Sequence, residues 1–102
     1  MWVRDDIPRA GGILYQWILR DFPFGPILLG YHDGCCKDEP QRVWQLTIEA
    51  LKIRKEPLHL AKDADDAKSM AVAIVRSKLN VLRELADKLM AESRAAKLNQ
   101  PV

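Results

Sequence analysis

The residues with the clearest chemical potential lie in one short stretch of the chain. His32, Cys35 and Cys36 fall within five residues, and His59 is the only other histidine. Thiolate and imidazole groups are common ligands of zinc, and His59 could complete a tetrahedral set. A cysteine whose proton is removed by a neighbouring histidine is also an effective nucleophile. The stretch therefore raises two possibilities, a metal centre and a Cys–His catalytic pair.

The spacing of these residues argues against both possibilities. Structural zinc sites usually separate their cysteines by about two to four residues, whereas Cys35 and Cys36 are adjacent. The sequence contains no second Cys-x-x-Cys, no phosphate-binding glycine loop and no His-Glu-x-x-His element. We therefore expect no metal, no cofactor and no catalytic residue, and we interpret the chain as non-enzymatic. No motif is specific enough to indicate a family.

Two groups of basic side chains could contact the phosphates of a nucleic acid. Arg76 and Arg83 are seven residues apart, which places them on one face of a helix, and a second group contains Lys52, Arg54 and Lys55. Acidic residues interleave with the arginines, however, and the net charge is only +2. Nucleic-acid-binding proteins usually carry a clear basic excess. A small nucleic-acid-binding regulator is therefore an alternative function, not the leading one.

The composition indicates one small globular domain that must position all of these residues. The chain has 102 residues, of which 48% are hydrophobic and 29% charged, the balance of a folded protein. Adjacent cysteines cannot join distant parts of the chain, which favours a reducing, intracellular compartment. Residues 13–31 are apolar, but charges, prolines and a glycine near their middle argue against a membrane-spanning helix. A membrane-associated accessory subunit that uses this stretch is a further alternative.

Composition divides the chain into residues 1–36 and residues 37–102. The first part holds all five glycines, both tyrosines, both phenylalanines and two of the three tryptophans. We expect it to form an irregular, aromatic-rich segment that packs on, or extends from, the second part. Within it, residues 13–20 favour a short helix, because Pro23 follows at the distance of a stop signal.

The second part predicts two helices. Asp38 is a good N-cap for a helix over residues 39–55, whose apolar side chains recur at helical spacing and which ends before Pro57. The 43 residues between Pro57 and Pro101 contain neither proline nor glycine. A helix over residues 63–98 is expected there, since Asp63 opens an acidic first turn. The predicted fold is therefore all-α, a helical hairpin with the N-terminal segment laid across it.

The long helix carries two adjoining apolar strips. One follows the three- and four-residue spacing of a coiled-coil seam and contains Val72, Val75, Leu79, Leu82, Ala86 and Leu89. The other contains Met70, Ile74, Val81 and Leu85. A helix of 35 residues is about 52 Å long at 1.5 Å per residue, more than the roughly 33 Å diameter of a compact chain of this size. Two strips indicate two neighbours, namely the first helix and either the aromatic N-terminal segment or another molecule.

The leading functional interpretation is a non-enzymatic protein–protein interaction module. The chain would be a small subunit or adaptor of a larger assembly, or a helical homo-oligomer. The predicted interface combines the long helix with N-terminal aromatic residues: Val72, Val75, Leu79, Leu82, Leu85, Leu89, Trp2, Trp17 and Phe24.

Overall fold

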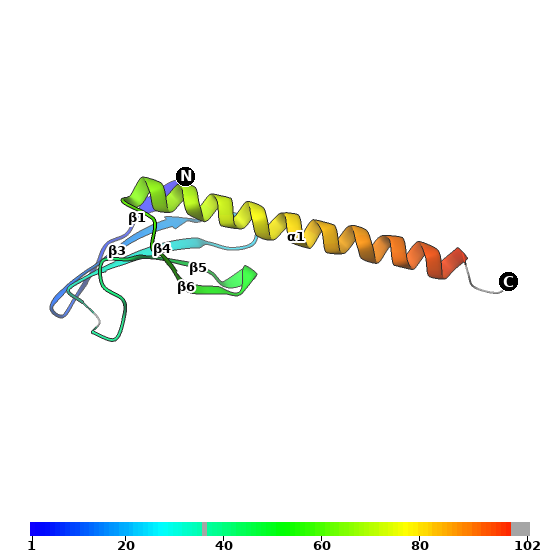
Figure 1. Ribbon diagram of the computed structural model, residues 1–102. Helices are drawn as coiled ribbons and strands as arrows, with labels where there is room; N and C mark the ends of the chain where they lie inside the picture. The colour runs from blue at the N-terminus through cyan, green and yellow to red at the C-terminus, as the bar shows by residue number, and fades with distance from the viewer. Residues whose placement is uncertain (36, 99–102) are drawn as a thin grey trace. The chain divides into compact units, whose positions relative to one another are not determined.

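The protein consists of an antiparallel β-sheet followed by one long helix, as the computed structural model shows (Figure 1). The structure describes residues 1–35 and 37–98. The elements, in chain order, are β1 (Trp2–Arg4), β2 (Ile7–Arg9), β3 (Gly12–Leu19), β4 (Ile27–Asp33), β5 (Trp44–Ile48), the short 3-10 helix η1 (Glu49–Leu51), β6 (Ile53–Leu58) and α1 (Ala64–Leu98).

The predicted all-α helical hairpin is wrong. Residues 1–36 are not an irregular segment, since they contain four strands, and the predicted helix over residues 39–55 is replaced by β5, η1 and the start of β6. With a single α-helix in the described part of the chain, no helical hairpin or coiled coil is present. The helix predicted over residues 63–98 is confirmed as α1. Asp63 caps this helix, because the Asp66 amide donates to Asp63 Oδ1 at 2.8 Å.

The spacing of apolar residues did not identify the strands β3 and β5, for two different reasons. Residues 13–19 are apolar at nearly every position, so spacing does not distinguish helix from strand there, and the aromatic and β-branched side chains favour the strand β3. In β5, Trp44, Leu46 and Ile48 alternate with Gln45 and Thr47, which is the period of two typical of a strand. Leu46 and Thr47 had also fitted a helical stripe, and the tertiary pairing decides between the two.

From β2 onward the strands form a meander in which each strand pairs with the next one in the chain. The order is β1-β3-β4-β5-β6, and β2 pairs with β3 beyond the end of β1. The Asp5 amide donates to the Gln16 carbonyl at 2.8 Å, so residues 2–9 follow β3 along most of its length. β6 is an edge strand, which explains how it accommodates Pro57.

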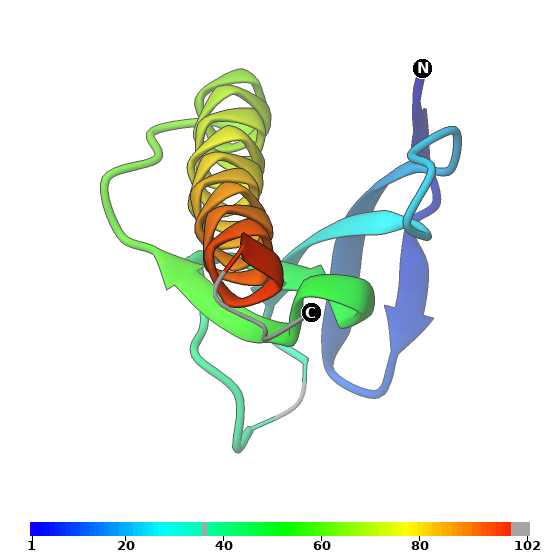
Figure 2. The ribbon, with the colours of Figure 1, turned by 90° about the vertical axis from the view of Figure 1, so that its right-hand side faces the viewer.

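One face of the sheet holds most of the large buried side chains. Strand alternation places Trp17, Leu29, Tyr31, Trp44 and Leu46 on the same face, through the pairs 17↔29, 29↔46 and 31↔44. The first turns of α1 lie beside this face (Figure 2), where the Lys68 ammonium is 3.5 Å from the centre of the Trp17 ring. Ala67 and Ala71 are fully buried in these turns. Their small side chains allow the helix to approach the sheet closely.

The chain forms two compact units. The first contains residues 1–71, that is, the sheet and the first turns of α1, and the second begins at Val72. All seven aromatic residues belong to the first unit.

Candidate functional site

The second unit presents an exposed apolar helix face. Its large side chains are between half and two-thirds exposed, which is unusual for residues of this size on one face of a helix. The exposed fractions are 53% for Val72, 51% for Val81, 51% for Leu82, 52% for Leu85, 64% for Leu89 and 56% for Met90. We call this set, with the half-buried Leu79, the helix face.

Helical geometry aligns the helix face with the buried side of the first turns. Ala67, Ala71 and Val75 are buried and lie four residues apart, so they form one line along α1. At 100° per residue, Leu82 and Leu89 fall within about 40° of the direction of Ala71. The line of apolar side chains therefore begins with buried residues, Ala67 to Val75, and continues with exposed residues, Leu82 and Leu89.

The helix residues that were predicted to form an interface differ in their exposure. Val75 is buried, Leu79 is half-buried, and Val72, Leu82, Leu85 and Leu89 are exposed. Only the exposed members are available to another molecule. Met90 has similar exposure and is absent from the predicted interface, although it lies eighteen residues, or five full turns, after Val72 and therefore in the same direction.

The predicted N-terminal aromatic contacts are divided in the same way. Trp17 is held inside the first unit, since the Arg4 guanidinium lies 5.8 Å and the Lys68 ammonium 3.5 Å from the centre of its ring. Trp2 is half-buried on β1, opposite Leu19 of β3. Phe24, in the β3–β4 turn, is 55% exposed.

Several of the basic residues predicted to contact nucleic acid already have acidic partners. Arg54 Nε lies 3.1 Å from Glu49 Oε2, and the Lys55 ammonium forms an ion pair with Glu39. That hydrogen bond from Lys55 lowers the pKa of the Glu39 carboxyl, although partial burial acts in the opposite direction. Lys52 is exposed after η1 and takes part in neither pair.

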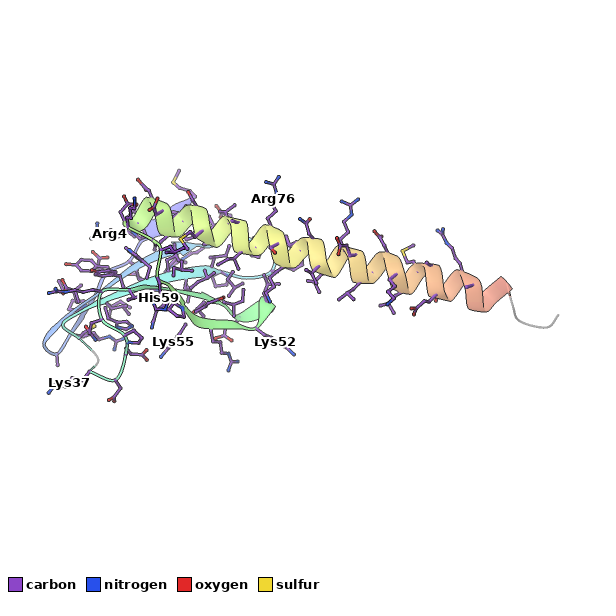
Figure 3. The ribbon with its side chains drawn as sticks, in the orientation of Figure 1. Arg4, Lys37, Lys52, Lys55, His59 and Arg76 are labelled. Carbon is purple, nitrogen blue, oxygen red and sulfur yellow. The ribbon has the colours of Figure 1, made fainter. Side chains whose placement is uncertain are left out.

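Arg76 and Arg83 belong to the second unit, whereas Lys52, Arg54 and Lys55 belong to the first. Both arginines are exposed on α1, and Arg76 extends away from the helix (Figure 3).

The structure brings together one of the Cys–His pairs that the sequence allows. His32 Nδ1 lies 3.3 Å from Cys35 Sγ, and both residues are buried. His59 is exposed after β6, and Cys36 lies outside the described residues. Within residues 1–35 and 37–98, no group of three or more His, Cys, Asp or Glu side chains could hold a metal ion.

A polar groove on the other face of the sheet is the feature that sequence reasoning missed. It has a volume of about 460 Å³, and its lining includes Gln16, Gly30, His32 and Gln45. The signal in the sequence was the alternation of Gln45 and Thr47 with apolar neighbours, which marks a strand with a polar face.

No family model, no curated protein and no solved structure matches the chain. No helix of the described part is long and apolar enough to cross a membrane.

Proposed function

We propose that this chain is a protein-interaction module, a small subunit or adaptor, that binds an amphipathic helix of another protein through the helix face. The observation that carries the proposal is the half or greater exposure of Leu82, Leu85 and Leu89 on one side of α1. Removing this surface from water is favourable, and a second apolar helix is the usual way to do so. The module is non-enzymatic, and its adjacent cysteines support a reducing, intracellular setting.

The charges beside the helix face indicate the chemistry of the partner. Over its first half, Arg76 and Arg83 border the helix face on one side, and Lys78 lies within it, seven residues before Leu85, so all three charges there are cationic. The acidic residues Glu84 and Asp87 lie farther round the helix. A partner helix with acidic residues beside its apolar stripe would therefore be complementary.

The same border argues against a second copy as the occupant. In a parallel pair of copies, Lys78 would face Arg83 of the second copy. In an antiparallel pair, the two arginine-bearing borders would face each other. Like charges meet at the arginines in either arrangement, which destabilises the pairing, although Lys78 would face Glu92 of the second copy in an antiparallel pair centred on Leu85.

The test uses two synthetic amphipathic peptides that share a leucine stripe, one bordered by glutamates and the other by lysines. The purified chain should bind the glutamate peptide and not the lysine peptide, and added salt should weaken the binding. Leu82→Asp should reduce the affinity by about thirtyfold or more, the effect of removing one hot-spot side chain.

Asn80→Asp is the matched control, because it introduces the same side chain two residues away on the opposite side of the helix. This variant should bind the glutamate peptide as well as the wild type does. Equal loss in both variants would contradict the proposed face. Light scattering of the chain alone should give the monomer mass, and a stable dimer would show that a second copy is the occupant.

A further inference from the structure

The groove on the open face of the sheet has the size and chemistry of a small-molecule site. Its volume of about 460 Å³ lies within the roughly 300–1,000 Å³ range of ligand pockets. It belongs wholly to the first unit, since every lining residue lies between Arg9 and Lys55. Figure 3 shows Lys37 and Lys55 on the side of the sheet away from the first turns of α1. None of the lining residues belongs to the helix face.

The floor of the groove contains a glycine that the fold does not require. Gly30 lies in the central strand β4 and pairs with Gln16 on one side and Gln45 on the other. A Cβ atom at this position would meet only Leu14 Cδ1, at 3.4 Å, which is ordinary van der Waals contact. Glycine weakens a strand interior and often marks a place where a ligand approaches the backbone. Its missing side chain leaves open space between the two glutamines.

The groups around this space combine apolar and hydrogen-bonding surface. Leu14 of β3 and Leu28 of β4 lie on the same face of the sheet as Gly30. The Gln16 and Gln45 backbones are about 10 Å apart, two strand spacings across the sheet. Within the described residues, the Gln16 side-chain amide forms no hydrogen bond, so both its donor and its acceptor are available. The Gln45 amide already donates to the Glu39 carboxyl, which leaves its acceptor oxygen available.

The mouth of the groove carries two cations without acidic partners. Arg9 and Lys37 are exposed, and among the described residues neither forms an ion pair. The other cation in the lining, Lys55, is already paired with Glu39. The lining also contains two acidic residues, Asp38 and Glu39, of which Glu39 is paired with Lys55. Arginine and lysine side chains that form no ion pair are well suited to a phosphate group.

We propose that this groove binds a nucleotide, with its phosphate at Arg9 and Lys37 and its base above Gly30, between the Gln16 and Gln45 amides. The apolar side chains of Leu14 and Leu28 contact the planar base. Glutamine amides read the polar edges of bases through paired donors and acceptors. An inorganic anion alone would leave most of the groove empty. The proposal is independent of the helix face and does not rest on the proposed function.

The test is calorimetric titration of the full chain with AMP, GMP, CMP and UMP, together with inorganic phosphate and the four nucleosides as separate probes. At least one nucleotide should bind more tightly than its nucleoside and than phosphate. Arg9→Gln combined with Lys37→Gln should weaken that binding by about tenfold or more, the effect of losing charge-assisted hydrogen bonds. Arg20→Gln is the matched control, because Arg20 is exposed and does not line the groove.

Gly30→Ala separates a role in binding from a role in folding. The added methyl group should leave the melting temperature unchanged or raise it, because glycine is unfavourable in strands, and should reduce nucleotide affinity. Unaltered affinity in Gly30→Ala with an intact fold would overturn the placement of the base. Absence of binding by all four nucleotides, or phosphate binding as tight as that of the nucleotides, would overturn the proposal itself.

Discussion

The two compact units of this chain use large apolar side chains in opposite ways. In the first unit, Leu29 and Leu46 are 0% exposed in the sheet, whereas in the second, Leu85 and Leu89 are 52% and 64% exposed on the helix. The apolar residues recur at every second position in the strands and at every third or fourth position in the helix. The first unit supplies a second layer that covers its apolar face, and the second unit does not. A regular apolar stripe therefore indicates that a covering layer is needed, but not that the same chain provides it.

The helix α1 contains both situations along a single line. Ala67 and Ala71 are 0% exposed and Val75 is 6% exposed, whereas Leu82 and Leu89, farther along the same side, have half or more of their surface exposed. Small residues allow close approach to a layer that is already in place. Large residues are needed where the covering surface comes from farther away, as a partner helix would.

The largest effect is expected from placing a charge on the covered part of this line. Ala71→Asp would bury a carboxylate without a partner and should lower the free energy of unfolding by about 3 kcal/mol or more. Ala91→Asp makes the same change on the outer side of α1, where the alanine is exposed, and should cost less than about 1 kcal/mol. Urea unfolding followed by tryptophan fluorescence measures both, because all three tryptophans lie in the first unit. Equal, small losses would show that the first turns of α1 are not closely packed.

A smaller effect is expected from the cation above Trp17. Lys68→Met keeps the length of the side chain and removes the charge that lies 3.5 Å from the ring centre. The free energy of unfolding should fall by about 0.5–1 kcal/mol, the usual contribution of a cation–π contact near the surface. Lys78→Met makes the same change in the second unit and should have almost no effect on the unfolding of the sheet. If the two variants unfold alike, the Lys68–Trp17 contact does not stabilise the first unit.

The sequence allowed the helix to be predicted, but not the sheet. The helix depends on local signals, namely the Asp63 cap and a long stretch without proline or glycine, and such signals can be recognised without tertiary information. The run 13–19 is apolar on both faces of β3, and residues 44–48 fit a helical stripe nearly as well as an alternating strand. Strand pairing, which is not local, decides both cases.

The helix face and the groove also differ in whether the sequence alone could predict them. Leu82, Leu85 and Leu89 were predicted to contact a partner because their spacing on one helix is visible in the sequence. Gln16 and Gln45, by contrast, become neighbours of Gly30 only through the register of three strands. The contact between His32 and Cys35 was one of several pairings that the sequence left open, and the β4 turn selects it.

The smallest effect concerns the acid sensitivity of the first unit. The hydrogen bond from Lys55 holds the pKa of Glu39 below its ordinary value of 4.5. A carboxyl whose pKa is lower in the folded than in the unfolded state stabilises the fold above its unfolded-state pKa, and this contribution is lost as the pH falls through the folded-state pKa. Because the Lys55 side chain is 62% exposed, solvent screening should limit the contribution to about 0.5 kcal/mol or less.

Lys55→Met should therefore lower the free energy of unfolding at neutral pH by this small amount, and the difference should disappear as the pH falls through the folded-state pKa of Glu39. Asp21, whose pKa is lowered by the N-terminal ammonium, contributes equally to the wild type and the variant, so its effect cancels. Lys88→Met, in the second unit, should leave the pH dependence of tryptophan-monitored unfolding unchanged. A change in that dependence caused by Lys88→Met would mean that the stabilities of the two units are coupled, and the contrast between a self-covered sheet and an uncovered helix would then need revision.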